Sequence, residues 1–138
     1  MNDRPFILIR GGIAEVREAT EQGYAIAEIG DSINLDQPTS KTRRARVGKG
    51  ISNTLTTSCN QAVVIKGNDM EKIRIRKLTP KECFRLMGFD DEDFEKAKEV
   101  NSDCQLYKRA GNSIVVNVLE AIFQQLKPYF AEGDNEAK

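Results

Sequence analysis

The sequence predicts an α+β fold, in which a small and mostly-β unit over residues 1–78 is followed by helices over residues 79–130. In the first unit, short apolar runs alternate with glycine-containing turns, which is typical of strands. A helix-start signal stands at position 79, and apolar residues recur at helical spacing from position 115. The 138 residues suffice for one domain or one large fragment of a domain, with a polar tail at residues 131–138.

The first 36 residues contain one clear strand and one ambiguous stretch. The apolar run at residues 6–9 predicts a strand that ends at Gly11-Gly12. Residues 13–33 do not predict one type of secondary structure. Their alanines suit a helix, whereas Gly23 and Gly30 interrupt it.

The middle of the chain is predicted to hold a loop and several strands. Residues 37–50 have almost no apolar content and must form a loop. Strands are expected over residues 54–57, 62–65 and 72–75. The last two flank a turn signal at residues 66–69, which predicts that they form a hairpin.

Helices are expected from residue 79 onwards. Thr79-Pro80-Lys81-Glu82 is a capping box with proline at the first helical position, and Gly88 ends this helix after two turns. The acidic residues 90–93 complement the dipole at the start of a second helix. The apolar face of that helix consists of Phe94, Ala97 and Val100. The last helix, which Pro128 is expected to end, is predicted from Val115, Val116, Val118, Leu119, Ile122, Phe123 and Leu126.

The charges are strongly segregated along the chain, although 21 basic residues balance 21 acidic ones. Residues 1–36 hold three basic and seven acidic side chains, a balance of −4. Residues 37–81 hold eleven basic and two acidic side chains, a balance of +9, and residues 82–138 return to −5 with seven and twelve. The basic middle third has the electrostatic character expected where phosphates bind.

The composition excludes several classes of site. Without histidine there is no Ser-His-Asp triad and no histidine metal ligand. Cys59, Cys83 and Cys104 are odd in number and widely spaced, which indicates free thiols rather than disulfides or a metal site. No window approaches the roughly 20 apolar residues of a membrane span, and no signal peptide follows Met1. We therefore expect a cytoplasmic protein without a membrane partner.

Two stretches resemble sequence motifs of the DNA (cytosine-5-)-methyltransferases. Residues 76–89 (RKLTPKECFRLMGF) resemble the ninth motif of that family, and residues 107–119 (YKRAGNSIVVNVL) resemble its tenth and last motif. Residues 52–57 (SNTLTT) look like the Thr-Leu pair of its target-recognition region. The resemblance implies that residues 1–78 are the target-recognition region, and that the last helix packs on an α/β S-adenosylmethionine-dependent domain.

The catalytic motifs of the family have no counterpart in this sequence. Its nucleophile is a cysteine directly after a proline, and none of Cys59, Cys83 or Cys104 follows one. The Glu-Asn-Val motif and the glycine-rich turn of the cofactor domain are missing too. Because the reaction needs a thiolate to activate the cytosine ring, we assign no catalytic residue and predict that this chain alone is inactive.

Two functions remain open at this point. The chain can be the C-terminal part of a DNA methyltransferase, as a fragment or as one half of a split enzyme, with the catalytic domain on the same or a second chain. The alternative is a non-catalytic DNA-binding module derived from such an enzyme. If the chain is part of a DNA methyltransferase, we expect that the methylation serves a restriction-modification system.

Double-stranded DNA is the partner that the resemblance and the basic loop imply. Arg44 and Lys41 are the first candidates for base edges, because arginine can pair bidentately with guanine. Solvated surface charge is the alternative. The five basic side chains within nine residues are Lys41, Arg43, Arg44, Arg46 and Lys49. Arg43, Arg46 and Lys49 can equally hold phosphates, which position the protein without specifying a sequence.

Further DNA contacts are expected after this loop. Thr54 looks like the threonine that touches the DNA backbone near the target base in this family, although a threonine satisfied within a strand is as good an interpretation. Thr57, Ser58, Asn60 and Gln61 lie where the second recognition loop of the family is found. Amide side chains can pair with adenine, but polar residues are also common in turns.

The resemblance also implies S-adenosylmethionine as cofactor, bound only together with the missing catalytic domain. Asn112 and Ser113 follow Gly111 at the predicted opening of the last helix, a turn that comes close to the amino-acid end of the cofactor in this family. A helix N-terminus suits a carboxylate. We therefore predict that both residues contact the cofactor.

Three charged residues of the ninth motif are expected to be scaffolding. Glu82 and Arg85 stand three residues apart on one helix and can pair, and Arg76 precedes them. The last helix would expose an apolar face without the catalytic domain, and the free chain would then hide it by self-association.

Overall fold

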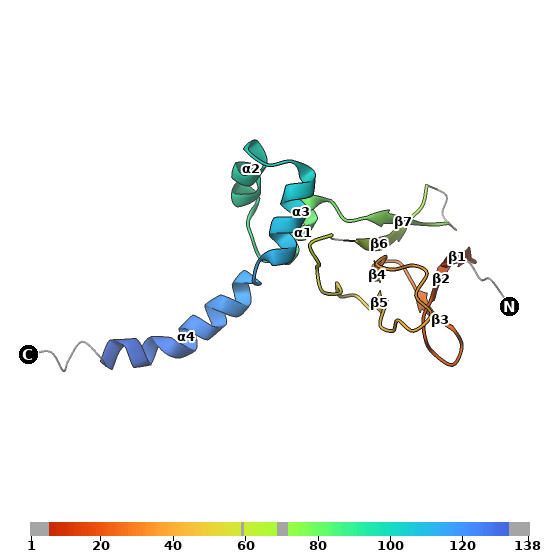
Figure 1. Ribbon diagram of the computed structural model, residues 1–138, viewed down its shortest axis with the longest axis horizontal. Coiled ribbons are helices and arrows are strands. Elements are labelled where there is room, and N and C mark those ends of the chain that lie inside the picture. Colours follow the sequence, from red (N-terminus) through yellow and green to blue (C-terminus); the bar gives the residue numbers. More distant parts are fainter. Residues whose placement is uncertain (1–5, 59, 69–71, 133–138) are drawn as a thin grey trace, which may run out of the picture.

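The computed structural model describes residues 6–58, 60–68 and 72–132, and it confirms the α+β class. Two antiparallel sheets precede a group of helices (Figure 1). The strands are β1 Ile7–Arg10, β2 Ile13–Arg17, β3 Tyr24–Ala27, β4 Ser32–Asn34, β5 Val47–Gly48, β6 Gln61–Lys66 and β7 Ile73–Lys77. The helices are α1 Pro80–Leu86, α2 Asp91–Glu99, α3 Asp103–Asn112 and α4 Val116–Glu132.

The first sheet has the order β1-β2-β3 and settles the ambiguous stretch in favour of strands. Ala14 pairs with Ile9 on one side and with Ala27 on the other. Gly23 takes a φ of 76°, a conformation that glycine adopts at little cost, and lies in the turn between β2 and β3. Glycines that interrupt a helical pattern therefore mark turns between strands here.

The second sheet has the order β5-β4-β6-β7 and contains the predicted hairpin. Strands β6 and β7 pair antiparallel from Ala62 opposite Lys77 to Lys66 opposite Ile73. Part of the turn between them lies outside the described residues. The strand expected over residues 54–57 is wrong, because these residues form a loop. Strand propensity depends on context, and this threonine-rich segment makes side-chain contacts to a neighbouring loop instead.

The first two helices begin as predicted. The Thr79 hydroxyl accepts a hydrogen bond from the Glu82 N–H, and the Glu82 carboxylate accepts one from the Thr79 N–H, which completes the capping box. Gly88, with a φ of 85°, follows the end of α1. The Asp90 side chain caps α2 by accepting a hydrogen bond from the Asp93 N–H at 2.8 Å.

The sequence did not predict a separate α3. This helix buries Leu106 and Ala110, which stand four residues apart on one face. Asn112 is its last residue and Ser113 is its C-cap. The expectation that Asn112 and Ser113 open the last helix is therefore wrong.

The last helix, α4, begins at Val116, whose N–H donates to the carbonyl of Met87 at 2.9 Å. It then projects away from the rest of the molecule (Figure 1). Pro128 lies inside α4 and does not end it. Proline removes one helix hydrogen bond, but residues 121–130 are all exposed, so water can take the place of the missing donor. Among the described residues, no helix is long and apolar enough to cross a membrane.

The described residues form two clusters of buried apolar side chains, one in each half of the molecule. The β half buries Ala14, Val16, Ala27, Ile33, Val64 and Ile73. The helical half buries Leu78, Cys83, Phe84, Phe94, Leu106 and Ala110. The Phe84 and Phe94 rings meet edge to face with centroids 5.3 Å apart. Val100, which was expected on the same face as Phe94, is 82% exposed because α2 ends just before it.

An ion pair joins the second sheet to the helices. The Arg76 guanidinium on β7 donates two hydrogen bonds to the Glu82 carboxylate on α1, at 2.6 and 2.8 Å. The expected pair between Glu82 and Arg85 is wrong, because Arg85 instead donates to Asp91 at 2.7 Å. Hydrogen bonds from Arg76 lower the pKa of Glu82 to about 2.

Candidate nucleic-acid interface

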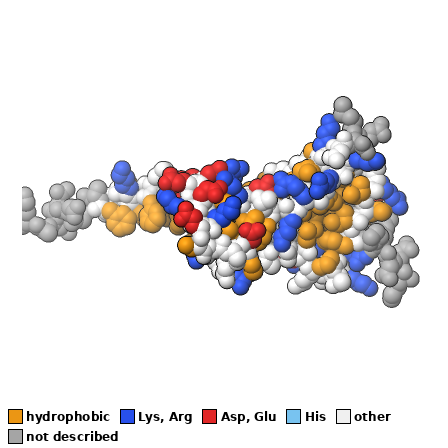
Figure 2. All heavy atoms as spheres, turned by 90° about the horizontal axis from the view of Figure 1, so that it is seen from above, with side chains coloured by type: hydrophobic (Ala, Val, Ile, Leu, Met, Phe, Trp, Pro, Cys, Tyr) orange, Lys and Arg blue, Asp and Glu red, His pale blue; other side chains and the backbone are white. Residues whose placement is uncertain are grey.

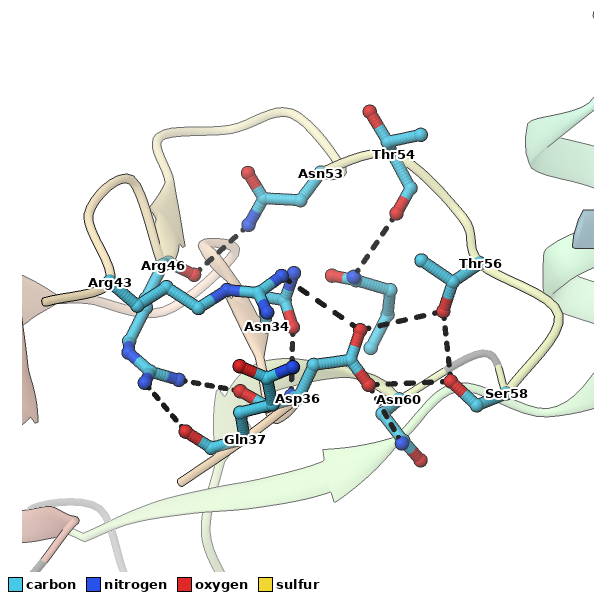
Figure 3. A network of polar contacts seen from close by, with 11 residues as sticks. Asn34, Asp36, Gln37, Arg43, Arg46, Asn53, Thr54, Thr56, Ser58 and Asn60 are labelled. Atoms are coloured by element: carbon cyan, nitrogen blue, oxygen red, sulfur yellow. Dashed lines mark hydrogen bonds and ion pairs between the residues drawn. The ribbon is translucent and has the colours of Figure 1, made fainter. Parts of the chain in front are cut away.

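Two loops of the second sheet lie side by side and hold most of the predicted DNA contacts. We call residues 35–46, between β4 and β5, the basic loop, and residues 51–58, after β5, the threonine loop. The Asn53 amide of the threonine loop donates to the carbonyl of Arg46 at 3.0 Å. Figure 3 shows that polar side chains of both loops point toward one another. The fold therefore unites two segments that the sequence presents as separate.

Three cations of the basic loop remain accessible to solvent. Lys41 and Arg44 are exposed. The Arg43 side chain is 32% exposed, and its guanidinium lies 4.0 Å from the carboxylate of Asp36. Ala45 has a φ of 53°, in the left-handed region that a side chain disfavours. This backbone conformation separates the exposed Arg44 from the buried residue that follows Ala45.

That buried residue is Arg46, which was predicted to contact DNA. Its side chain is 0% exposed, and its guanidinium donates to the carbonyls of Asp36 and Gln37 at 2.8 Å each. It also lies 4.9 Å from the centroid of the Phe6 ring. Burial lowers the pKa of Arg46. The guanidinium thus fixes the basic loop from inside, and we leave Arg46 out of the proposed DNA surface.

Lys49 follows β5 and has two acidic partners in the structure. Its ammonium lies 2.7 Å from Asp31 and 3.6 Å from Glu28. The hydrogen bond to Asp31 raises the pKa of Lys49. Because Lys49 is still 59% exposed, a phosphate could share it, but much of its charge is already compensated.

The threonine loop exposes two threonines to solvent and is supported from below by amide side chains. Thr54 and Thr57 are exposed, as a DNA contact requires. Beneath them, Gln61 is 0% exposed and its amide donates to the carbonyl of Thr54 at 3.4 Å. Asn60 is half-buried and donates inward. Of the two predicted amide contacts, Gln61 therefore supports the loop from below, and Asn60 does so in part.

Asp36 connects the two loops, and it was not predicted from the sequence as a residue of the site. Its carboxylate accepts hydrogen bonds from Asn60 at 2.8 Å, Ser58 at 3.3 Å and Thr56 at 3.4 Å (Figure 3). Arg43 approaches the same carboxylate from the basic loop. The one signal in the sequence was an acid a few residues before a basic run, which by itself indicates nothing about its partners.

Of the two predicted cofactor contacts, Ser113 lies beside two hollows and Asn112 beside one of them. Ser113 lines an open hollow of ≈ 520 Å³ together with Thr54 and Gly111. Asn112 and Ser113 together line a second hollow of ≈ 600 Å³, beside Phe84. The Ser113 hydroxyl donates to the carbonyl of Ala110 at 2.9 Å, as a C-cap. The structure therefore brings Ser113, but not Asn112, into one hollow with the threonine loop.

The surface charge follows the two halves of the molecule. On the face drawn in Figure 2, acidic side chains gather over the helices and basic ones predominate over the sheets. Within the described part of the chain, no group of three or more acidic or cysteine side chains could hold a metal ion. Cys83 is buried and Cys104 is exposed, neither of them in a disulfide bond, and Cys59 lies outside the described residues.

Known proteins match most of this chain. Residues 9–128 match the family described as C-5 cytosine-specific DNA methylase. The orphan methyltransferase M.Rho11sI of Bacillus phage rho11s is 51% identical over 84 residues, which are 60% of this chain and 16% of that protein. The type II methyltransferase M2.ScrFI of Lactococcus lactis subsp. cremoris is 42% identical over 79 residues, 57% of this chain and 22% of that protein.

A bacterial relative gives the same result over a shorter segment. The DNA-cytosine methyltransferase of Escherichia coli strain K12 is 47% identical over 55 residues, which are 40% of this chain and 12% of that protein. The chain thus spans less than a quarter of the length of each of these relatives. The match over residues 9–128 covers far more than half of the chain, which therefore belongs to the C-5 cytosine-specific DNA methylase family.

Proposed function

We propose that this chain is the DNA-recognition part of a DNA (cytosine-5-)-methyltransferase, and that it completes the S-adenosylmethionine site of a catalytic domain on the same or a second chain. One observation carries the proposal. The basic loop, with its exposed cations, and the threonine loop, with its exposed threonines, are joined through Asp36, which contacts Arg43 of the first and Thr56 of the second. Family membership supports methyl transfer to cytosine as the reaction served.

Each exposed group suits a different kind of DNA contact. The guanidinium of Arg44 can pair bidentately with the edge of a guanine, and Lys41 can reach a base edge or a phosphate. The hydroxyls of Thr54 and Thr57 can donate to phosphate oxygens. Phosphate contacts fix the register of the protein on the duplex, and base contacts then supply sequence specificity.

The chain contributes one edge of the cofactor site in this proposal. When bound, S-adenosylmethionine supplies the methyl group. The Ser113 hydroxyl in the hollow beside Thr54, and the exposed Asn112 amide, fit hydrogen bonds to the amino-acid end of the cofactor. The helix N-terminus that first suggested this contact lies three residues further on, at Val116. The assignment of Asn112 and Ser113 therefore rests on the family motif.

The catalytic thiolate must come from elsewhere, since no cysteine in the sequence follows a proline. Cys83 is enclosed in the helical core and cannot reach a base. We propose that this chain alone transfers no methyl group. The apolar face of α4 would then pack on the catalytic domain, and in its absence would drive self-association. This face consists of Val118, Ile122, Phe123, Leu126 and Phe130, all exposed.

The test is reassembly of activity from two parts. The purified chain would be mixed with a catalytic part of a matched methyltransferase that lacks its own equivalent of residues 9–128. Transfer of labelled methyl groups from S-adenosylmethionine to DNA is expected from the mixture and from neither part alone. Phe123→Asp on α4 should prevent reassembly, whereas the control Val100→Asp, at another exposed apolar site, should not.

Two results would change the proposal. Methyl transfer by the rigorously purified chain alone would contradict it. A folded partner that fails to restore methylation, combined with sequence-specific DNA binding by this chain alone, would favour the non-catalytic DNA-binding module.

A further inference from the structure

We infer that Asp36 is a positioning residue that decides how well this protein discriminates between DNA sequences. Its carboxylate holds the basic loop and the threonine loop in one arrangement, and its charge lowers the affinity of the surface for unrelated DNA. The inference rests on the proposed function, because it assigns a role within the proposed DNA interface.

The backbone of Asp36 is fixed to buried residues on both sides. Its N–H donates to the Asn34 side chain at 2.8 Å, and Asn34 is a buried residue at the end of β4. Its carbonyl accepts a hydrogen bond from the buried guanidinium of Arg46 at 2.8 Å. Asp36 is thus held by the sheet and not only by the loop in which it lies.

The carboxylate projects from this fixed point toward the threonine loop. One oxygen accepts from Asn60 and Ser58, and the other accepts from Thr56. The hydroxyls of Thr56 and Ser58 are also 2.9 Å apart, so they are held relative to each other. The exposed Thr57 lies between these two residues. The position of the Thr57 hydroxyl therefore depends on the Asp36 carboxylate.

The same carboxylate acts on the basic loop through its charge. Asp36 is the only acid in residues 35–46, and the Arg43 guanidinium lies 4.0 Å from it. A negative charge at a DNA-binding surface repels phosphates of every sequence alike. Correct placement of the loops, in contrast, fixes the register in which base contacts form, so it matters most for the sequence that is read.

These two effects have opposite signs when the charge is removed. Asp36→Asn keeps the shape of the side chain, but it removes the charge and weakens the hold on both loops. Affinity for unrelated DNA should rise about two- to fivefold, since one repulsive charge near phosphates is lost. The ratio of affinities for preferred and unrelated DNA should fall about tenfold or more, because misplaced contacts no longer distinguish bases. A purely structural role for Asp36 would lower both affinities.

The experiment uses the reassembled or full-length enzyme. A preferred duplex is first selected from a randomised pool, and a scrambled duplex of equal composition serves as unrelated DNA. Binding to both is measured for the unchanged protein, Asp36→Asn, and the double variant Thr56→Val with Ser58→Ala. The double variant removes hydrogen bonds but no charge, so discrimination should fall without any gain for unrelated DNA. Glu99→Gln, an exposed acid on α2, is the charge control and should change neither value.

Each outcome decides the question. Unchanged discrimination in Asp36→Asn overturns the inference and leaves the proposed function intact. Loss of affinity for both duplexes, with a lowered unfolding midpoint, assigns Asp36 to folding alone and also overturns it. If Asp36→Asn does not fold, the double variant decides, and full discrimination there overturns the inference. An unchanged enzyme that prefers no duplex overturns the proposed function itself.

Discussion

Gly111, the penultimate residue of α3, lies against the backbone of Thr56. A Cβ atom at position 111 would stand 2.4 Å from the Thr56 carbonyl oxygen and 2.6 Å from the Thr57 nitrogen. Both are backbone atoms, so no side chain can turn away to make room. This contact joins the end of α3 directly to the threonine loop. Any side chain at position 111 must therefore displace one of them.

Gly111→Ala should consequently destabilise the protein, although the same change in an open helix stabilises by about 1 kcal/mol. We expect a loss of about 1–3 kcal/mol in the free energy of unfolding, as for other overpacked sites. Urea unfolding would measure it. Gln105→Ala, at an exposed position of the same helix, is the control and should change stability little. A Gly111→Ala protein that is more stable than the unchanged one would show that the threonine loop moves away from the added methyl group at little cost.

Arg46→Met should be destabilising because it removes the donors that satisfy two loop carbonyls. The side chain is 0% exposed, and the carbonyls of Asp36 and Gln37 would lose their partner. We expect a cost of about 2–4 kcal/mol in the free energy of unfolding. The neighbouring Arg44→Ala is the matched control, and as an exposed residue it should cost less than about 0.5 kcal/mol. Equal stabilities of the two variants would argue against the internal role of Arg46.

The exposed cations should determine how salt affects DNA binding. Each phosphate neutralised by a protein cation adds about 0.9 to the slope of log affinity against log salt concentration. Lys41→Ala should therefore reduce the slope by up to about one unit in the reassembled enzyme. Glu92, on the acidic α2, offers a control position at which Glu92→Gln should leave the slope unchanged. If Lys41→Ala does not alter the slope, Lys41 contacts no phosphate and is an ordinary solvated surface residue.

Arg44 offers a way to separate base reading from phosphate holding. Arg44→Lys keeps the charge but loses the planar guanidinium that can grip a guanine. If Arg44 reads a base, the variant should lose about 1–3 kcal/mol of discrimination at one position of the DNA site. Binding to a panel of single-base variants of the selected duplex would show it. Equal affinity changes across the whole panel would assign Arg44 to the DNA backbone.

The Arg76 and Glu82 pair predicts a loss of stability in acid. The pKa of Glu82 is about 2 in the folded protein and 4.5 ordinarily, so ionised Glu82 stabilises the folded state above pH 4.5. That contribution should disappear as the pH falls from 4.5 toward 2. The side chain is 30% exposed, so solvent screening reduces the expected loss to about 1–2 kcal/mol.

Unfolding measured across this pH range would test the pair. Glu82→Gln should remove this loss of about 1–2 kcal/mol from the pH dependence of the free energy of unfolding. Glu99→Gln, on the exposed face of α2, should not change it. An identical pH profile for Glu82→Gln and the unchanged protein would exclude the pair as a source of stability.

Local signals in the sequence predicted those elements that depend on neighbouring residues. The capping box of Thr79 and Glu82 predicts where α1 begins, because both residues of the box lie within four residues of chain. The hairpin of β6 and β7 follows from a turn between two apolar runs. The start of α4 was misplaced because Gly111 looks like a helix boundary, whereas it is a close contact between α3 and Thr56.

By itself, the sequence determined the α+β class, the segregation of charge and the family to which the chain belongs, since composition and short motifs carry this information. Only the tertiary structure decided which arginine faces solvent, because Arg44 and Arg46 are chemically equal and differ in the backbone turn at Ala45. It also decided that Asp36 holds two loops together, since Asp36 meets Asn60 across 24 residues of chain. Contacts of this kind depend on how β4 and β6 pair in the sheet, and no local pattern encodes them.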